Sequence, residues 1–193
     1  MDENLKKVSF TEMKNGTKAD YDLLTKYEHE FVSGLPDRIL QELKNLGESL
    51  DGYKVSRLEH SLQSATRAEK DGADEEMIVA TLIHDIGDSL APNNHSQLVA
   101  AILRPYVSEK VDWIILHHGM FQEYYYAHHV GRDRNVREQF KDHPYYQDTV
   151  DFCEKWDQKS FDPEYDSFTL EHFEPMVRLE AYFLSSQNTR QSF

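Results

Sequence analysis

Residues 77–87, Met-Ile-Val-Ala-Thr-Leu-Ile-His-Asp-Ile-Gly, form an almost wholly apolar run that ends in a histidine–aspartate pair. Asp74 precedes the run and is a suitable N-cap for a helix. A helix that is apolar on nearly all sides is typical of a protein core. The stretch therefore predicts a buried helix that delivers His84 and Asp85 at its inner end. An isolated histidine in such a helix is more often a hydrogen-bonded core residue than a metal ligand, so the pair must be judged with its surroundings.

Helical patterns continue on both sides of this core helix. Ser56-Arg57-Leu58-Glu59 has the form of a capping box and predicts a helix that runs to Asp71-Gly72. By periodicity and stop signals, further helices are expected at about residues 20–33, 36–46, 95–104, 108–119, 144–157 and 169–184. The stretch from Phe121 to Asn135 has weak periodicity and many Tyr, His and Arg residues, which suits a lid or pocket wall better than a core helix.

The expected fold is therefore an all-α helical bundle. A chain of 193 residues fits one domain. We expect its chemical core at about residues 56–157, with helices before it at 19–47 and a C-terminal helix at about 169–184.

Composition narrows the classes of partner. The chain has 21 Lys and Arg against 35 Asp and Glu, a formal charge of −14, which opposes binding to nucleic acid or to an anionic membrane. No run is long and apolar enough to span a membrane, and the first residues lack the apolar stretch of a signal peptide, so a cytoplasmic protein is expected. The single cysteine, Cys153, excludes an internal disulfide and reads as a buried or idle thiol.

The ten histidines are the conspicuous feature, because imidazole is a common metal ligand and proton carrier. The expected helices would bring imidazoles and carboxylates together from five segments. Burying so many of these groups without a metal would leave them unpaired. The candidate residues are His60, His84, Asp85, His95, His117, His118 and Asp157.

This ordered set, with Ile83-His84-Asp85-Ile86-Gly87, resembles the HD-domain superfamily of all-helical metal-dependent phosphohydrolases. Within it, local strings are similar to the mixed-valent di-iron oxygenases, the group of myo-inositol oxygenase and the phosphonate-cleaving PhnZ- and TmpB-like enzymes. The strings are Leu58-Glu59-His60-Ser61-Leu62-Gln63, Ala100-Ala101-Ile102-Leu103-Arg104-Pro105 and His118-Gly119-Met120-Phe121-Gln122.

The resemblance implies two iron ions in a mixed-valent Fe(II)/Fe(III) pair, with dioxygen as co-substrate. One iron would be held by His60, His84 and Asp157, the second by His95 and His118, and Asp85 would bridge them. His118 is preferred to His117, which then serves as a hydrogen-bond donor near the site. Carboxylate and imidazole ligands without thiolates suit iron or manganese. The same cage also serves hydrolysis by two metal ions, so it does not separate the two chemistries.

Other residues are candidates for catalysis and substrate binding. The resemblance places Asp88 at a substrate-contacting position, and its alternative is a hydrogen-bond acceptor behind a ligand. Tyr124, Tyr125 and Tyr126 offer ring faces to a quaternary ammonium group, with core packing as their alternative. The related enzymes carry a Tyr-x-x-Glu loop before the first histidine, whereas this chain has Leu50-Asp51-Gly52-Tyr53, so either Tyr53 or an acid such as Glu28, Glu30 or Asp51 takes that place. The full candidate set is Asp85 and Asp88 for catalysis, and Gln63, Asp88, Gln122, Tyr126, His129, Arg134, Lys159 and Tyr53 for substrate.

The resemblance favours an oxygenase that cleaves the carbon–phosphorus bond of a substrate like 1-hydroxy-2-(trimethylamino)ethylphosphonate, giving glycine betaine and phosphate. The partner would be that small-molecule phosphonate. The first alternative is an HD phosphohydrolase acting on a phosphate ester or nucleotide. The second is a ligand-sensing or scaffold domain without activity. Purification without stoichiometric metal would favour this alternative.

Overall fold

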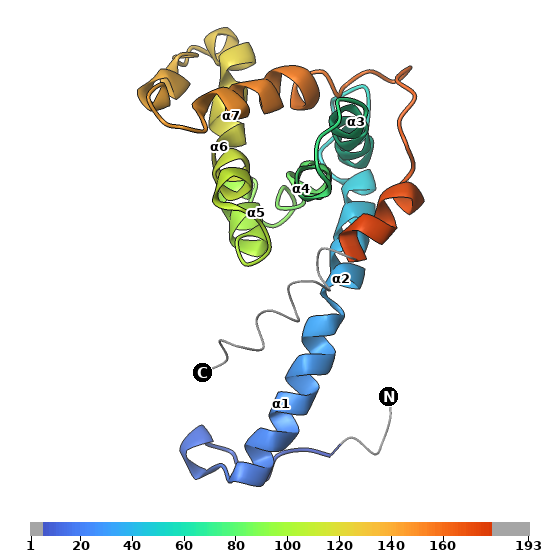
Figure 1. Cartoon of the computed structure of the whole chain (residues 1–193), viewed down its shortest axis with the longest axis vertical. Helices are drawn as coiled ribbons and strands as arrows, with labels where there is room; N and C mark the ends of the chain where they lie inside the picture. Colours follow the sequence, from blue (N-terminus) through green and yellow to red (C-terminus); the bar gives the residue numbers. More distant parts are fainter. Residues whose placement is uncertain (1–5, 179–193) are drawn as a thin grey trace.

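The computed structural model describes residues 6–178, and these residues form helices and loops with no strand among them. Figure 1 shows their arrangement, and the expected all-α fold is confirmed. The α-helices are α1 (Lys18–Ser33), α2 (Leu35–Asn45), α3 (Arg57–Lys70), α4 (Glu75–Ile83), α5 (His95–Leu103), α6 (Glu109–Tyr126) and α7 (Tyr146–Phe152). Residues 170–178 are also helical, and the rest of the helix expected at 169–184 lies outside the described residues.

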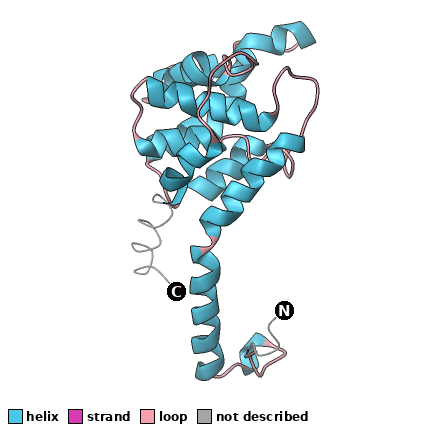
Figure 2. Cartoon of the chain, turned by 90° about the vertical axis from the view of Figure 1, so that its right-hand side faces the viewer, coloured by secondary structure: helices cyan, strands magenta, loops and turns pink. Residues whose placement is uncertain are grey.

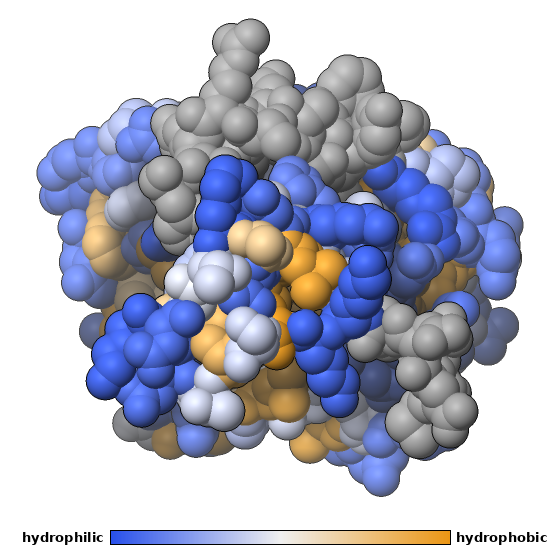
Figure 3. Space-filling view, turned by 90° about the horizontal axis from the view of Figure 1, so that it is seen from below, coloured by the Kyte–Doolittle hydropathy of each residue, from blue (hydrophilic) through white to orange (hydrophobic). Residues whose placement is uncertain are grey.

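Short helical turns complete the chain between these helices. They are η1 (Met13–Asn15), η2 (Leu46–Glu48), η3 (Ala127–Val130), η4 (Val136–Phe140) and the π-helical turn η5 (Cys153–Asp157). Helix α1 projects away from the bundle, and α2 leads into it (Figures 1 and 2). Seen from the α1 end, the described surface is mostly hydrophilic, with smaller hydrophobic areas between (Figure 3). None of the helices within residues 6–178 combines the length and the apolar character that crossing a bilayer requires.

Local capping signals set where the site-bearing helices begin. Helix α3 starts with the expected capping box: the Ser56 hydroxyl accepts from the Glu59 N–H (3.1 Å), and the Glu59 carboxylate accepts from the Ser56 N–H (2.7 Å). Asp74 caps α4 by accepting from the Met77 N–H at 3.0 Å. Because each cap satisfies backbone donors that would otherwise lack a partner, it fixes the register in which the helix carries its functional side chains.

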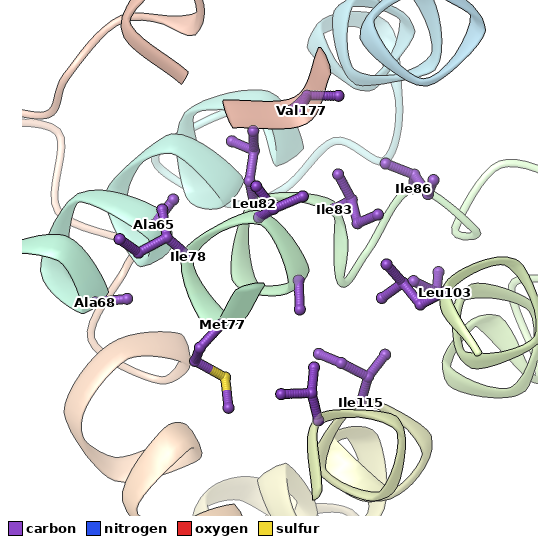
Figure 4. Packing of buried hydrophobic residues seen from close by; sticks show 14 of the residues in the cluster. Ala65, Ala68, Met77, Ile78, Leu82, Ile83, Ile86, Leu103, Ile115 and Val177 are labelled. Atoms are coloured by element: carbon purple, nitrogen blue, oxygen red, sulfur yellow. The ribbon is translucent and has the colours of Figure 1, made fainter. Parts of the chain in front are cut away.

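The core is built around α4, as the apolar run predicts. Figure 4 shows Leu82 and Ile83 of this helix between side chains of neighbouring helices, among them Ala65 of α3 and Ile115 of α6. Every residue from Met77 to Ile83 is buried. Each large apolar side chain buried in this way stabilises the fold by about 1.5–3 kcal/mol. The packing holds the end of α4, with His84 and Asp85, inside the bundle.

Helix α6 does not end near Gly119, as we expected from the sequence, but continues to Tyr126. Gly119 lies where α6 packs against α5 and does not mark the end of the helix. A Cβ atom at Gly119 would lie 2.8 Å from the Ser96 hydroxyl and 3.6 Å from Nε2 of His95, so a larger residue there would force the Ser96 side chain of α5 to move. The expected pocket wall at 121–135 consequently begins as helix, with Phe121 fully buried.

A π-helical turn follows α7 and ends at Asp157. The Gln158 N–H donates to the Cys153 carbonyl at 3.0 Å, a bond that spans five residues. Such turns are rare and are frequent at functional sites. Cys153 is fully buried, its thiol lies 3.5 Å from the His118 carbonyl, and burial raises its pKa well above the ordinary value, which supports an idle thiol.

The Asp20 carboxylate ties residue 9 to the start of α1, and its hydrogen bonds give a pH dependence. The Thr17 hydroxyl and the backbone N–H groups of Ser9 (2.7 Å) and Thr17 (2.9 Å) donate to it and hold its pKa well below the ordinary value of 3.8. A carboxylate with a lowered pKa stabilises the fold above its unfolded-state pKa, and this stability is lost as the pH falls through the folded-state pKa. We expect Asp20→Asn to speed amide exchange at Ser9 and Thr17 about fivefold at pH 6.

The measurement is hydrogen exchange followed residue by residue, with the amides of α4 as an internal control. In the wild-type protein the same two amides should lose protection only below about pH 4. Equal exchange rates in Asp20→Asn and wild type at pH 6 would contradict this role of Asp20.

Candidate metal centre

Four helices and the π-helical turn bring imidazole and carboxylate groups to one place in the bundle. Most of these side chains are buried, and the His95 side chain is 24% exposed, which opens the group on one side. Groups whose ligand atoms all lie within 4.8 Å of one another are His60–His84–Asp157, His84–Asp85–His118 and Asp85–Asp88–His95.

The tautomers of three histidines follow from their backbone contacts. In each of them Nδ1 lies against a carbonyl oxygen, which only accepts hydrogen bonds, so Nδ1 carries the proton. The contacts are His60 to Ser160 (2.9 Å), His84 to Thr81 (2.7 Å) and His118 to Ile115 (2.7 Å). Their Nε2 atoms are therefore acceptors in the neutral form. This is the arrangement in which histidines hold metal ions.

The Nε2 atoms face one another in two pairs. Nε2 of His60 lies 3.2 Å from Nε2 of His84, and Nε2 of His95 lies 3.3 Å from Nε2 of His118. Two neutral acceptors at this distance repel each other unless a cation lies beside them. The donor set therefore fits a pair of metal ions, one at each pair of histidines.

Asp85 lies between the two pairs and divides its oxygens between them. Oδ2 is 3.2 Å from Nε2 of His60 and 3.1 Å from Nε2 of His84. Oδ1 is 3.4 Å from Nε2 of His95 and 3.5 Å from Nε2 of His118. This is the geometry that a carboxylate bridging two cations requires.

Asp157 serves only the first pair. Its Oδ1 lies 3.3 Å from Nε2 of His60 and 3.8 Å from Nε2 of His84, and it accepts a hydrogen bond from Nε2 of Gln122 at 2.9 Å. The two clusters are therefore unequal: the first pair has a carboxylate of its own besides Asp85, whereas Asp88 stands behind His95, with Oδ1 3.4 Å from Nδ1.

The electrostatics favour charged groups here despite their burial. Burial disfavours ionisation of Asp85, but the charges of His84 and Arg57 outweigh this and hold the pKa of Asp85 well below its ordinary value. Burial likewise opposes protonation of His84, yet Asp85 and Asp157 raise its pKa to about 10. In the absence of a metal, protons supply the positive charge that the carboxylates demand, and a bound metal displaces them.

Arg57 belongs to this centre although sequence reasoning did not single it out. Its side chain is only 11% exposed, Nε donates to Asp88 (2.7 Å), and Nη2 contacts Oδ2 of Asp85. The neighbouring carboxylates raise its pKa against the effect of burial, so it stays charged. The available signal was its position three residues before His60, which puts both side chains on one face of α3.

A cleft of about 1260 Å³ opens onto the centre, and Asp85, His95, His118 and Asp157 line it. A second missed residue, Phe161, lines one side: its ring stacks on His60 (4.4 Å between centroids) and on Tyr53 (4.9 Å). Phe161 lies in a loop after the last ligand, and nothing in the sequence around it predicts this contact.

The structure brings only some of the expected substrate residues to the cleft. Those that line it are Tyr53, Asp88, Gln122 and Tyr126. Among the acids considered beside Tyr53, Glu28 and Glu30 are exposed on α1, far from the cleft in sequence and fold, and Asp51 does not line it.

The structure does not place the other four expected substrate residues in the lining of the cleft. Gln63 is turned to the backbone of Asp162, to which its amide donates at 2.8 Å. The Arg134 guanidinium lies over the Tyr124 ring at 4.1 Å, and the His129 ring lies tilted against that of His128, with 3.9 Å between centroids. Lys159 lines a different cavity. The sequence pattern does not reveal the direction in which these side chains point.

His117 and His118 are separated clearly. His118 is buried with Nε2 in the second cluster, whereas His117 bonds the Trp113 carbonyl through Nδ1 (2.8 Å) and stacks on the Trp113 ring (3.8 Å between centroids). Successive residues of an α-helix are rotated by about 100° about its axis, so the side chains of residues 117 and 118 point in different directions.

Comparison with known proteins agrees with this geometry. Residues 57–149 match the family model of the HD domain. A protein of Leisingera caerulea named 1-hydroxy-2-(trimethylamino)ethylphosphonate dioxygenase (glycine-betaine-forming) is 48% identical over 58 residues. The matched segment covers 30% of this chain and 26% of that relative, so the chain spans only about a quarter of the relative's length.

Proposed function

We propose that this chain, which carries an HD domain over residues 57–149 within its all-α bundle, is an oxygen-dependent di-iron enzyme that cleaves the carbon–phosphorus bond of a 1-hydroxyphosphonate. The substrate we favour is 1-hydroxy-2-(trimethylamino)ethylphosphonate or a close analogue. Each turnover consumes one substrate and one dioxygen and releases glycine betaine and phosphate. No external reductant is needed, because the four electrons that dioxygen takes up come from the substrate.

One observation carries the proposal: the two oxygens of Asp85 are divided between two histidine pairs at the base of a cleft. The Leisingera caerulea relative, through its name, adds the reaction and the substrate. We assign the first ion to His60, His84 and Asp157, the second to His95 and His118, and the bridge to Asp85.

Bound iron supplies dioxygen activation and positive charge for the oxygens of the substrate. The chain's own residues fix the geometry around it. Oδ1 of Asp88 lies 3.4 Å from Nδ1 of His95, on the side of the ring away from Nε2, and Oδ2 accepts from Nε of Arg57. Gln122 donates to Asp157 and lines the cleft, so it orients a ligand carboxylate at the substrate side.

The cleft offers separate surfaces for the two ends of a zwitterionic substrate. Arg57 is a buried, permanently charged fork at the anionic end, suited to a phosphonate oxygen. Tyr125, Tyr126 and Glu123 also line the cleft. Tyrosine faces attract a quaternary ammonium group by about 0.5–2 kcal/mol each.

Arg57→Ala should raise KM for the phosphonate about tenfold or more while two metal ions stay bound, because a charge-assisted hydrogen bond to the substrate is lost. Arg57→Lys should fall between, since it keeps the charge but loses the fork. The measurement is steady-state kinetics with metal content by elemental analysis. Arg38→Ala is the matched control, because Arg38 lies on α2, is partly exposed over the Phe31 ring and does not line the cleft. Loss of metal with unchanged KM would assign Arg57 to Asp85 alone.

The proposal is tested by phosphate release from 1-hydroxy-2-(trimethylamino)ethylphosphonate with and without dioxygen. The protein is purified anaerobically, and its iron is counted. Oxygen-dependent release, with one dioxygen consumed per phosphate and two irons per chain, is expected. Phosphate release that persists without dioxygen, or that occurs only from phosphate esters with manganese or cobalt, would overturn the proposal in favour of a hydrolase.

A further inference from the structure

A second cavity lies outside the cleft that serves the metal centre. It measures about 410 Å³ and shares no lining residue with the cleft. It lies between the C-terminal end of α3 and the segment that follows α7. We call it the basic pocket, and its lining residues are Arg67, Lys70, Asp71, Lys155, Lys159 and Tyr165.

The charge of the basic pocket is opposite to that of the whole chain. Four cationic side chains line it against one carboxylate, whereas the chain carries a formal charge of −14. The carboxylate, Asp71, already accepts a hydrogen bond from the Trp156 indole at 2.9 Å. Positive charge confined to a pocket of an acidic protein attracts small anions, which can enter the pocket, and not extended anionic surfaces.

The usual structural role accounts for part of this cluster. Cations at the end of a helix satisfy free carbonyls. Arg67 donates to the Lys159 carbonyl (3.1 Å) and Lys70 donates to the Asp166 carbonyl (3.1 Å), which ties the loop to α3. Lys155 forms an ion pair with Asp151 at 2.8 Å.

Two features are left over after this accounting. Among residues 6–178, no carboxylate forms an ion pair with Arg67, Lys70 or Lys159, and the buried Nε of Arg67 has no hydrogen-bond partner there. Cζ of the Arg67 guanidinium lies over the Tyr165 ring, 3.8 Å from its centroid, which restrains the position of the guanidinium. A guanidinium held in this way, with two lysines beside it, has donors left for a ligand.

We propose that the basic pocket binds a phosphoryl oxyanion, free or carried on a small molecule, at a site separate from the metal centre. Phosphate has several acceptor oxygens that point in different directions, as donors from α3 and from residues 155–159 require. The volume exceeds that of the anion alone and lies in the range of small-molecule sites.

The position of the pocket connects it to the metal centre through a short backbone segment. Asp157 contributes its carboxylate to the first cluster, the Lys159 carbonyl is held by Arg67, and the Ser160 carbonyl accepts from Nδ1 of His60. An anion held by Arg67 and Lys159 therefore touches the segment that places Asp157.

The test is isothermal titration of inorganic phosphate into the metal-loaded full chain. Lys155→Gln/Lys159→Gln should weaken one class of phosphate site about tenfold or more. Lys18→Gln/Lys26→Gln is the matched control, because it removes the same charge from exposed lysines of α1 that also pair at i,i+4. It should change that affinity by no more than about twofold. Phosphate bound at the metal centre is common to all three proteins, so the difference between the two variants reports the basic pocket.

Equal affinities in all three proteins would overturn the proposal, as would an equal loss in both variants, which would mean long-range charge alone. Saturable phosphate binding on the order of 1 mM or tighter is expected in the wild type. A parallel titration with glycerol phosphate distinguishes a free anion from a carried phosphoryl group. Because the assay contains no phosphonate and follows no oxidation, its outcome is independent of the proposed enzymatic activity.

Discussion

Asp85→Ala should remove both metal ions from the protein and lower the rate of oxygen-dependent phosphate release about a thousandfold or more. Among residues 6–178, Asp85 is the single carboxylate that faces both histidine pairs, with Oδ2 towards His60 and His84 and Oδ1 towards His95 and His118. Without it, two cations at close range would have no shared anion between them. The measurement is elemental analysis of reconstituted protein together with the activity assay.

Asp157→Ala is the informative comparison for that result. Asp157 faces only His60 and His84 within this centre. Its loss should therefore weaken binding of the first ion and leave the second ion bound, so that the protein holds about one ion per chain. Circular dichroism shows whether either variant is folded. If Asp85→Ala fails to fold because Arg57 loses a buried partner, Asp85→Asn keeps the shape of the side chain and tests the same bridge. An Asp85 variant that retains two ions would refute the bridging role.

The helices could be anticipated because their signals are local. The capping box at Ser56 and Glu59 and the cap at Asp74 depend on residues three apart, so the sequence alone places the starts of α3 and α4. The end of α6 could not be anticipated in this way. Gly119 looks like a helix stop, but it is small because α5 passes close to it, and that contact is set by the tertiary fold.

The candidate site shows the same division. The candidate ligands are brought together as their order along the chain suggested, and each lies on or at the end of a helix. The side chains around them were harder to assign. Lys159 was expected near substrate because it follows Asp157, yet it lies beyond the end of η5, where the chain leaves the helix, and it lines a different cavity. Arg57 was missed because its partners, Asp85 and Asp88, lie on another segment.

The neighbouring pair His117 and His118 allows the second ion to be tested against a matched change in the same helix turn. His118→Ala should reduce the metal content to about one ion per chain and lower the rate of oxygen-dependent phosphate release about a hundredfold or more, because His95 and Asp85 alone would hold the second ion. His117→Ala should leave two ions bound and the rate nearly unchanged.

Without metal, His117→Ala should be less stable to heat than His118→Ala, which is the reverse of the order expected for loss of activity. The His117 ring packs between Trp113 (3.8 Å between centroids) and Phe140 (5.0 Å), so its removal should cost about 1–2 kcal/mol of folding free energy. Removing the His118 ring also removes the close contact between its Nε2 and Nε2 of His95 (3.3 Å), which offsets part of the lost packing. A His117→Ala protein that loses one ion, beside a His118→Ala protein that keeps two, would exchange the roles assigned to these residues and place the second ion outside the cleft.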